Sequence, residues 1–401
     1  AVPISAATPP PAAARPPKVL FVMASYAVGG TELQLASLIA NRPGWAERYA
    51  LESITFLPPR SADVAERFGA LGVVNTLIDR EQTSFPRFFT RLLAQVRRSR
   101  PDVLHAMLDS STGAWGRLAG VVARVPAIVQ SDRSIVEEGT STHFRLRPFL
   151  DRRTKRFLPN AHAIAERLMR SGVPADRITV VPSGVDLGRF APDAVRGTGR
   201  FRRHHDDVVA GFVGRFHAVK RIDLLLRAVA SLPEGARPDR LVLAGDGPEA
   251  PAVREQVAAD PWLREHVELI GTCTDVPAFL AETDYLVLSS EVEGAPNAVI
   301  EAMAMRRPVV ATRVSDVPSI VGETGLLAEP GDVASLAAAI AAMQGLSGEA
   351  RAALGADARL RVEREYDVKV VAERFWEAHR QLLPDRAAPG PSGRRSRWAD
   401  G

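Results

Sequence analysis

The chain has 401 residues, 46% of them hydrophobic and 24% charged, which is typical of a soluble globular protein with two domains. Its single cysteine, Cys273, excludes an intrachain disulfide and any metal site built from several cysteines. The net charge of +4 is uneven, because residues 1–190 carry 25 Lys and Arg against 16 Asp and Glu, and the remainder carries 26 against 31. No apolar run reaches the roughly 20 residues that a membrane-spanning helix needs.

The two ends of the sequence are rich in Pro, Ala and Gly. We expect residues 1–17 and 387–401 to be disordered, and the first of these lacks the apolar core of a secretory signal. Two basic stretches, residues 84–100 and 143–157, mix arginines with Phe and Leu. They are either solvated helix faces or surfaces that attract anionic lipid headgroups. Nucleic acid is not an expected partner, because no motif that recognises nucleic acid accompanies the basic residues.

Short β-branched runs alternate with helical patterns along most of the chain. The first series of predicted strands covers residues 18–25, 51–56, 73–78, 102–107 and 127–131. The pattern loosens after residue 186, and a second series covers residues 208–214, 240–247, 267–271, 284–290 and 308–312. Near-continuous apolar strands separated by helices predict parallel sheets covered on both faces. The expected fold is therefore α/β, with two doubly wound Rossmann-like domains facing a central cleft.

This pattern predicts boundaries as well. The N-terminal domain is expected at residues 18–186, a linker at 187–207 and the C-terminal domain at 208–366. A last helix at 367–386 is expected to pack back on the N-terminal domain. Ligands of doubly wound sheets bind beyond the carboxyl ends of the strands, so the cleft between the domains is the expected site.

Gly29 and Gly30 lie between the first strand and a helix. Glycines there let the backbone approach a ligand, and the following helix start attracts anions, although a plain strand–helix turn has the same pattern. The chain has neither G-x-x-x-x-G-K-[ST] nor, after a strand, G-x-G-x-x-G. An ATP P-loop and a dinucleotide fingerprint are therefore not indicated.

Two cations, Arg215 and Lys220, follow the strand at 208–214. A guanidinium fork and an ammonium at a strand end suit a diphosphate, although either residue alone is also common on a surface. Another loop, Thr272 to Asp275, also follows a strand and opens a helix.

Glu293 and Glu301 are eight positions apart around a tight turn. We interpret Asn297 as the N-cap of the helix that contains Glu301, and we expect amides 296–299 to face the same space. Ionised carboxylates accept hydrogen bonds from sugar hydroxyls. The alternative is a pair of acids that only complement the helix dipole.

Together these segments resemble the retaining glycosyltransferases of family 4, which have the GT-B fold. The resemblance extends from about residue 18 to residue 383, and the E-x7-E spacing is its most specific element. It includes GGTELQLASLIA, PSGVDLGRF, GRFHAVKRID, LVLAGDGPE and SSEVEGAPNAVIEAM.

The resemblance implies a role for each matching residue. Arg215 and Lys220 would hold the diphosphate leaving group, and Glu293 would contact the transferred sugar. Glu301 would bind the ribose hydroxyls, and backbone at Thr272 and Cys273 would meet the base. The predicted donor site is completed by Gly29, Gly30, Ala295, Pro296, Asn297 and Ala298.

The resemblance also implies the chemistry and the partners. The donor would be a nucleoside-diphosphate sugar, with UDP preferred over GDP, and no cofactor or metal would be needed, because a donor phosphate oxygen takes the acceptor's proton. No D-x-D occurs, and the residues from His204 to Asp207 lie in the linker, where a metal is not expected. The acceptor would be a glycan or a lipid-linked molecule of envelope or exopolysaccharide synthesis, and the protein would be cytoplasmic, at the inner face of the membrane.

Some positions depart from the family pattern. His105 is followed by Met107 where a second histidine is frequent, so His105 is either an acceptor residue or a buried strand residue. Asp132 and Arg133 follow a strand and are expected near the acceptor. Ser183 replaces a frequent asparagine, and Arg221 replaces a frequent glycine. A nucleotide-sugar epimerase and a nucleotide-sugar-binding protein without turnover remain alternatives, and labelled donors distinguish them from a transferase.

Overall fold

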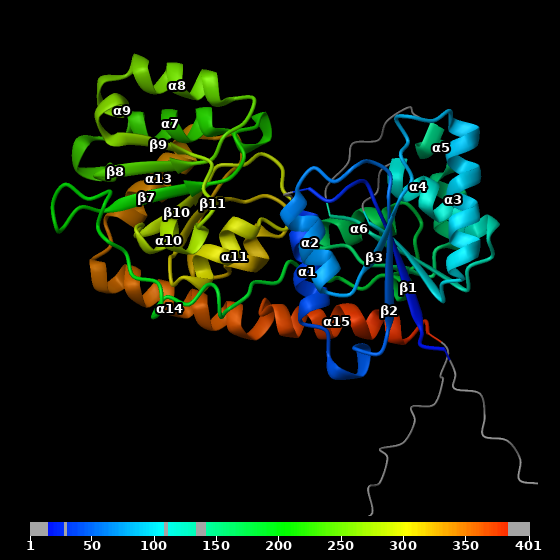
Figure 1. The fold of residues 1–401 in the computed structure, drawn as a ribbon. Coiled ribbons are helices and arrows are strands. Elements are labelled where there is room, and N and C mark those ends of the chain that lie inside the picture. Colours follow the sequence, from blue (N-terminus) through cyan, green and yellow to red (C-terminus); the bar gives the residue numbers. More distant parts are fainter. Residues whose placement is uncertain (1–14, 28–29, 108–110, 134–141, 384–401) are drawn as a thin grey trace, which may run out of the picture.

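The computed structural model describes residues 15–27, 30–107, 111–133 and 142–383, as two parallel six-stranded sheets with helices on their faces (Figure 1). The predicted α/β fold with two Rossmann-like domains is confirmed. Gly29 and nearly all of the two predicted disordered ends lie outside the described residues.

The N-terminal sheet has the order β3-β2-β1-β4-β5-β6. Its central strand β1 is buried, since five of its six residues are apolar and enclosed. The strands are β1 (Lys18–Met23), β2 (Ala50–Thr55), β3 (Val74–Leu77), β4 (Val103–Met107), β5 (Ala127–Ser131) and β6 (Arg156–Phe157). The helices are α1 (Gly30–Ala40), α2 (Ala62–Ala70), α3 (Phe85–Ser99), α4 (Ser111–Val122), α5 (Thr142–Arg153) and α6 (His162–Arg170).

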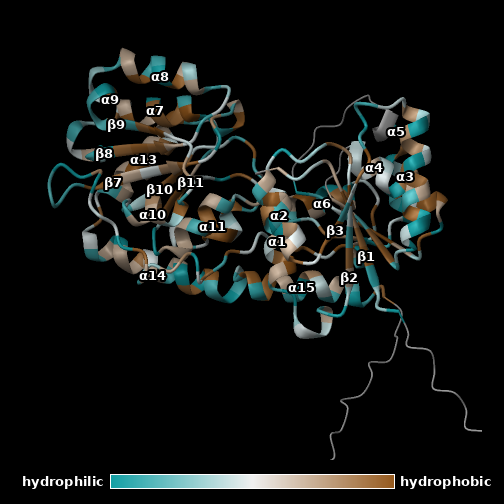
Figure 2. Ribbon diagram, viewed as in Figure 1, coloured by the Kyte–Doolittle hydropathy of each residue, from teal (hydrophilic) through white to brown (hydrophobic). Residues whose placement is uncertain are grey.

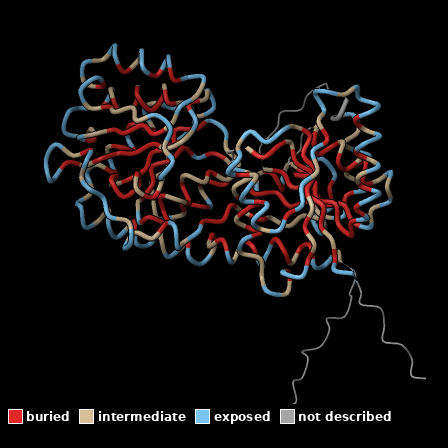
Figure 3. The backbone as a smooth tube through the Cα atoms, in the orientation of Figure 1, coloured by how far each residue is buried: buried red, intermediate tan, exposed pale blue. Residues whose placement is uncertain are grey.

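The C-terminal sheet repeats this topology with the order β12-β11-β10-β7-β8-β9. Its strands are β7 (Val209–Val213), β8 (Arg240–Ala244), β9 (Val267–Gly271), β10 (Tyr285–Leu288), β11 (Val309–Thr312) and β12 (Gly325–Ala328). Its helices are α7 (Ile222–Ser231), α8 (Ala250–Ala259), α9 (Pro261–His266), α10 (Val276–Ala281), α11 (Asn297–Ala304), α12 (Val317–Val321), α13 (Val333–Gln344) and α14 (Gly348–Glu365). The four central strands, β7, β8, β10 and β11, are largely apolar and enclosed, whereas the outer helix faces are hydrophilic and exposed (Figures 2 and 3).

In both sheets the order in which successive strands are added reverses between the first and the fourth strand. The reversal falls between β1 and β4 in one domain and between β7 and β10 in the other. Loops on the two sides of such a reversal diverge and leave a crevice at the carboxyl ends of the strands, which is where doubly wound proteins bind ligands.

The chain crosses between the domains twice, and the two crossings pair as a parallel bridge between Val185 and Asp367. After the second crossing, helix α15 (Val368–Arg380) packs along α1 on the N-terminal domain (Figure 1). Trp376 and Phe375 are buried in the same apolar cluster as Phe21. The last helix therefore completes the core of the first domain.

Residues 187–207 contain no helix or strand, but they are not a free linker. Phe190 and Phe201 are 4% and 3% exposed and belong to the core of the C-terminal domain. Arg359 on α14 donates to the Phe190 carbonyl at 2.6 Å. The segment is thus fastened along the C-terminal domain.

Candidate active site

The predicted donor residues come together at the carboxyl edge of the C-terminal sheet. Arg215 and Lys220 follow β7, and Glu293 follows β10, the strand next to β7. Thr272 and Cys273 follow β9 at the outer side of the same edge. Because the strands are parallel, their carboxyl ends share one edge of the sheet, so the side chains converge there.

The Lys220 ammonium contacts the Glu293 carboxylate. Lys220 Nζ donates to Glu293 Oε1 at 2.5 Å, and Ser290 Oγ donates to the same oxygen at 2.5 Å. Both charged side chains are largely enclosed, with 23% and 11% exposed. Ser289 Oγ donates to the Lys220 carbonyl at 2.8 Å, which fixes the backbone of the two loops together. An ammonium has three N–H donors, so Lys220 can hold Glu293 and still bind a phosphate oxygen.

Glycines let the loop after β7 and the loop after β8 pass each other in direct backbone contact. A Cβ on Gly245 would overlap the Gly214 carbonyl oxygen, and one on Gly247 would overlap the Phe216 carbonyl oxygen. The Arg215 side chain borders this crossing, because its Cγ lies 3.1 Å from a Cβ built on Gly247. A side chain at either glycine would therefore displace the loop that carries Arg215.

Helix α11 begins at Asn297, and Pro296 precedes it with extended backbone. The prediction that Asn297 is the N-cap is therefore wrong, because it is the first helical residue. Pro296 has no N–H group, and the Val299 N–H donates to the Pro296 carbonyl at 3.2 Å. The free donors at this helix start are the amides of Asn297 and Ala298, fewer than predicted. Ala295, in the loop before them, is partly buried against the core.

Glu301 lies one turn into α11 and is partly buried. Burial raises the pKa of Glu301 to about 7, against the opposing charge of Arg189. A carboxyl group that titrates near neutrality is characteristic of functional sites. Hydroxyl donors such as a ribose diol would stabilise its ionised form.

The loop after β9 is partly exposed and ends in a hydrogen bond that caps α10. Gly271 has φ +69°, and Asp275 Oδ1 accepts the Ala278 N–H at 3.2 Å at the start of α10. Cys273 packs on the C-terminal core, and burial raises the pKa of its thiol. The thiol therefore stays protonated at neutral pH, while Thr272 is exposed at the edge.

Two glycines bring the domains into contact across this edge. A Cβ on Gly30, at the start of α1, would lie 3.3 Å from Asn297 Nδ2. A Cβ on Gly294 would lie 2.9 Å from the carbonyl oxygen of Arg133, which follows β5. The carboxyl edges of the two sheets thus face each other, with the Glu293 loop between them.

Arg133 is the cationic group that the N-terminal domain presents here. Its Nη2 donates to Ser183 Oγ at 3.2 Å. Burial lowers the pKa of Arg133 to about 10, and Glu32 on α1 opposes this shift. Burial also raises the pKa of Glu32. Glu32 and Ser290 were not predicted from the sequence, although Glu32 comes two positions after Gly30 and Ser290 ends a predicted strand.

Of the two alternatives for His105, an acceptor residue or a buried strand residue, the structure supports the second. Its side chain is fully buried, with Nε2 2.8 Å from Ser131 Oγ and Nδ1 3.0 Å from His379 Nε2. His379 Nδ1 donates to the Phe375 carbonyl at 2.8 Å, so its Nε2 accepts from His105 and both rings are neutral. Burial lowers both pKa values, that of His379 to about 4.

Asp132 is also enclosed, with 1% exposed, and its Oδ1 accepts the Gln130 Nε2–H at 3.0 Å. Of the three predicted acceptor residues, Arg133 alone is partly exposed. The carboxyl edge of the N-terminal sheet therefore presents a partly exposed guanidinium rather than an imidazole.

The backbone explains why glycine is frequent in the family at the position of Arg221. Arg221 has φ +46° and ψ +48°, in the left-handed region that disfavours side chains. Its guanidinium forks onto Asp223 at 3.0 and 3.1 Å and reaches Glu291 at 3.2 Å. The hydrogen bond to Asp223 raises the pKa of Arg221. These ion pairs offset the backbone cost beside Lys220.

We expect Arg221→Gly to change the free energy of unfolding by less than about 1 kcal/mol, because glycine removes the left-handed penalty while the lost ion pairs are partly exposed and weak. Arg221→Ala loses the same ion pairs but keeps the penalty, so it should be the less stable variant. Urea denaturation measures both. A glycine variant less stable than the alanine variant would contradict the explanation.

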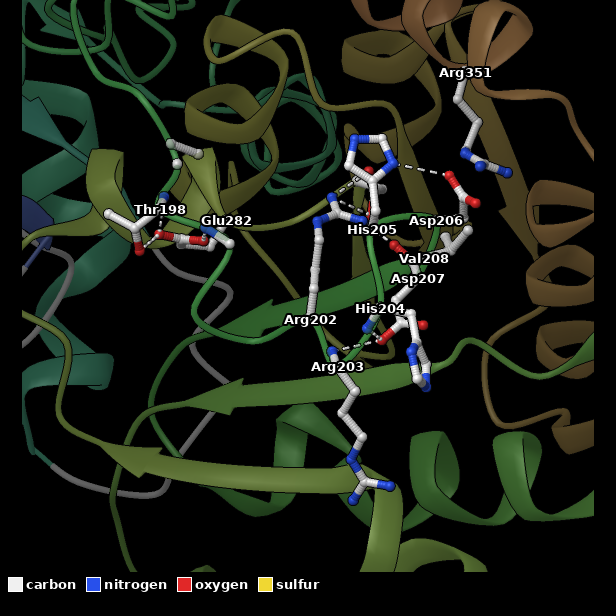
Figure 4. Close-up of a pocket in the computed structure, with 14 residues that line it drawn as sticks. Thr198, Arg202, Arg203, His204, His205, Asp206, Asp207, Val208, Glu282 and Arg351 are labelled. Atoms are coloured by element: carbon white, nitrogen blue, oxygen red, sulfur yellow. Dashed lines mark hydrogen bonds and ion pairs between the residues drawn. The ribbon is translucent and has the colours of Figure 1, made fainter.

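A cavity of about 720 Å³ lies at the opposite, amino-terminal edge of the C-terminal sheet (Figure 4). Its charged groups are satisfied within the protein. Arg202 forks onto Asp284 at 2.8 Å, and Glu282 accepts two bonds from Thr198 at 2.6 Å. His204 to Asp207 line this cavity, and no group of His, Cys, Asp and Glu among the described residues could hold a metal ion. The predicted donor residues lie at the opposite, carboxyl edge of this sheet.

Two doubly wound domains whose carboxyl edges face each other have the GT-B arrangement. Two family models match the chain, Glycosyltransferase Family 4 over residues 37–189 and Glycosyl transferases group 1 over residues 207–344. The chain belongs to this glycosyltransferase family.

Known relatives and structures are consistent with this assignment. The chain is 35% identical over 242 residues to the D-inositol 3-phosphate glycosyltransferase of Geodermatophilus obscurus, covering 55% of this chain and 52% of that protein. It is 27% identical over 254 residues to the UDP-Gal:alpha-D-GlcNAc-diphosphoundecaprenol alpha-1,3-galactosyltransferase of Escherichia coli, covering 60% and 65%. The chain spans about half the length of the first curated relatives it matches.

Among solved structures, Anabaena HepE in complex with UDP superposes with a TM-score of 0.77 at 20% identity, covering 91% of this chain and 100% of HepE. This likeness shows the shared fold. In the described part of the chain, no helix has both the length and the apolar character needed to cross a membrane.

Proposed function

We propose that this chain is a retaining glycosyltransferase that moves a sugar from a nucleoside-diphosphate sugar to an alcohol acceptor. The observation that carries the proposal is the convergence of Arg215, Lys220, Glu293 and Glu301 at one edge of the C-terminal sheet. A diphosphate is bound by cations, and the hydroxyls of the sugar and of the ribose are each bound by a carboxylate that accepts their hydrogen bonds. All of these groups occur together at this edge.

The reaction breaks the bond between the sugar carbon and the diphosphate, so negative charge develops on the leaving phosphate. Arg215, Lys220 and the amides of Asn297 and Ala298 are fixed donors that stabilise this charge, which is usually the largest contribution to catalysis. Glu293 would accept hydrogen bonds from the hydroxyls of the sugar, and Glu301 would accept hydrogen bonds from the hydroxyls of the ribose. The acceptor's proton would pass to a phosphate oxygen of the departing diphosphate, while its oxygen forms the new bond on the same face of the sugar.

The donor that we propose is a UDP-sugar rather than a GDP-sugar. Support comes from the E. coli relative, whose name gives UDP-Gal as donor, and from HepE, which was crystallised with UDP and with UDP-glucose. No cofactor or metal is required in this scheme, because protein cations and amides stabilise the diphosphate.

Incubation with labelled UDP-glucose, UDP-galactose, UDP-N-acetylglucosamine and GDP-mannose, each with lipid-diphosphate-linked sugar acceptors, tests the proposal. Transfer with an unchanged anomeric configuration in the NMR spectrum of the product is the expected result. Interconversion of the donor without an acceptor would indicate an epimerase. Binding of donor without any product would indicate a non-catalytic binding protein.

We also propose that the acceptor is lipid-linked and that the N-terminal domain docks on the inner face of an anionic membrane. Helices α3 and α5 both pack on α4 and form one outer surface, which we call the α3–α5 surface (Figure 1). Phe85 and Phe149 are 47% and 41% exposed there, and Arg153 lies over the Phe149 ring at 5.3 Å. Arginines beside exposed aromatics are typical of surfaces that bind lipid headgroups.

We expect the protein to sediment with vesicles that contain phosphatidylglycerol at low salt, and to be released as salt rises. A variant with four charge-reversed arginines of the α3–α5 surface should lose this binding: Arg97, Arg98, Arg152 and Arg153. A matched control reverses four exposed arginines of the C-terminal domain and should keep it: Arg227, Arg254, Arg264 and Arg313. Equal loss in both variants would mean that only net charge matters, and no binding by the wild type would end the membrane proposal.

A further inference from the structure

Helix α6 of the N-terminal domain is capped by a residue of the other domain. The residue before it, Ala161, has no polar side chain and makes no capping bond. Instead, Asp316 Oδ2 accepts the His162 N–H at 2.6 Å, and Asp316 Oδ1 accepts the Ala163 N–H at 3.0 Å. His162 Nδ1 lies 2.9 Å from Asp316 Oδ2. Both carboxylate oxygens are thus used across the domain boundary.

Two features of Ser315, the residue that precedes Asp316, are energetically unfavourable. Ser315 has φ +47°, in the left-handed region, and its Oγ is buried with no hydrogen-bond partner. Each feature is unfavourable for a non-glycine residue, and such features persist where the surroundings impose them. The sharp turn at Ser315 sends the next side chain toward α6, so the two costs accompany the bonds that cross to the other domain.

The capping contact lies beside the candidate active site on both domains. Asp316 follows β11, and the neighbouring strand β10 leads to Glu293. On the other side, α6 follows β6, and the neighbouring strand β5 leads to Arg133. Asn160 lies near residues of both domains at this place. Its N–H donates to the Asp132 carbonyl at 3.0 Å, and its side chain is 3.5 Å from a Cβ built on Gly294.

We propose that Asp316 is a positioning residue that holds the two domains closed on each other at the distance needed for sugar transfer. It makes no contact with the diphosphate residues and acts through α6. The carboxylate neutralises the positive end of the α6 dipole and satisfies two of its free N–H groups, and both effects exist only when the domains are together. The catalytic part of this proposal rests on the proposed function, whereas the effect on domain closure does not.

Loss of the Asp316 carboxylate should raise the ratio of open to closed molecules by about fivefold, the change in equilibrium that one lost helix cap causes. Asp316→Asn keeps one oxygen acceptor, so it should restore part of the closed population. The control is Asp332→Ala, because Asp332 Oδ1 caps α13 by accepting the Ser335 N–H at 3.0 Å inside the C-terminal domain. Both alanine variants lose a cap, but only the first loses a contact between domains.

The measurement is the distance between two spin labels, at Glu66→Cys on α2 and Arg254→Cys on α8, in full-length protein that carries Cys273→Ser and has no donor present. We expect Asp316→Ala to gain a longer distance component while Asp332→Ala keeps the wild-type distribution. An unchanged distribution in Asp316→Ala would overturn the proposal. This readout does not depend on activity, so it stands even if sugar transfer is never detected.

With a working transfer assay, Asp316→Ala should lower kcat by up to about fivefold and leave the Kd for UDP nearly unchanged, because Arg215, Lys220 and Glu301 all lie in the C-terminal domain. Asp316→Asn should recover part of kcat. A weakened Kd for UDP in Asp316→Ala with unchanged kcat would contradict a positioning role, since it would mean that Asp316 supports the donor site itself.

Discussion

Lys220→Ala is expected to lower kcat for sugar transfer about 100- to 1,000-fold, the usual cost of removing one fixed donor from a developing oxyanion. Two effects combine in this variant. The leaving diphosphate loses a cation, and the Glu293 carboxylate loses the ammonium 2.5 Å away, so that its charge repels the phosphates. Steady-state kinetics and UDP titration by calorimetry measure both effects.

A double variant separates the two effects. Lys220→Ala combined with Glu293→Gln removes the repulsion but not the loss of the cation, so it should recover part of the UDP affinity without recovering kcat. Lys369→Ala, at an exposed lysine on α15, is the control and should behave as wild type. Full activity of Lys220→Ala would show that Lys220 does not contact the diphosphate.

Glu301→Gln is expected to weaken UDP binding about 10- to 100-fold at pH 8, because hydrogen bonds to an ionised group are worth about 1.5–3 kcal/mol. Burial raises the pKa of free Glu301 to about 7, and ribose hydroxyls favour its ionised form, so binding should release a proton near neutrality. Wild-type affinity should therefore rise between pH 6 and 8 and level off above pH 8. The glutamine variant should lack this part of the pH dependence.

The UDP phosphates titrate in the same range, so the difference between wild type and variant is the quantity that tests the role of Glu301. Calorimetry in two buffers with different ionisation enthalpies counts the protons released. Equal proton release by wild type and Glu301→Gln would exclude Glu301 as the ribose ligand.

The raised pKa of Glu301 also lowers the stability of the unliganded protein at high pH. Its folded pKa of about 7 lies above the ordinary value of 4.5, so its contribution to stability is fully present below pH 4.5 and is lost as pH rises through 7. Glu301→Gln should therefore be more stable than wild type at pH 8 and nearly equal at pH 4.5, which thermal unfolding at the two pH values measures. Under the proposed function, Glu301 lowers stability in exchange for a carboxylate that can bind a ligand, a common trade at functional sites.

Much of the fold could be predicted from the sequence because buried parallel strands are nearly continuous apolar runs. The two strands that were missed, β6 and β12, are edge strands with weak signals. β6 has two residues, and β12 reads GLLA, without a β-branched side chain. Local pattern alone does not distinguish such segments from loops.

The candidate site was predictable where its residues form a local motif at a strand end, as at Arg215, Glu293 and Glu301. It was not predictable where partners are far apart in the chain. His105 bonds to His379, 274 positions away, and Asp316 caps a helix 154 positions before it. Neither pairing leaves a local signal, because Ala161 offers no capping residue and His105 lies in an ordinary apolar strand.

The position of α15 has a consequence for how the protein is made. The N-terminal domain is translated first, but Trp376 and Phe375 fill its core, and the Trp376 indole donates to the Leu38 carbonyl at 2.8 Å. Residues 15–186 therefore emerge from the ribosome while the apolar surface that Phe375 and Trp376 cover is still exposed. That surface is covered only after the entire C-terminal domain has been synthesised. Domains usually mature in the order of synthesis. Of these two domains, the one that is translated first is the last to complete its core.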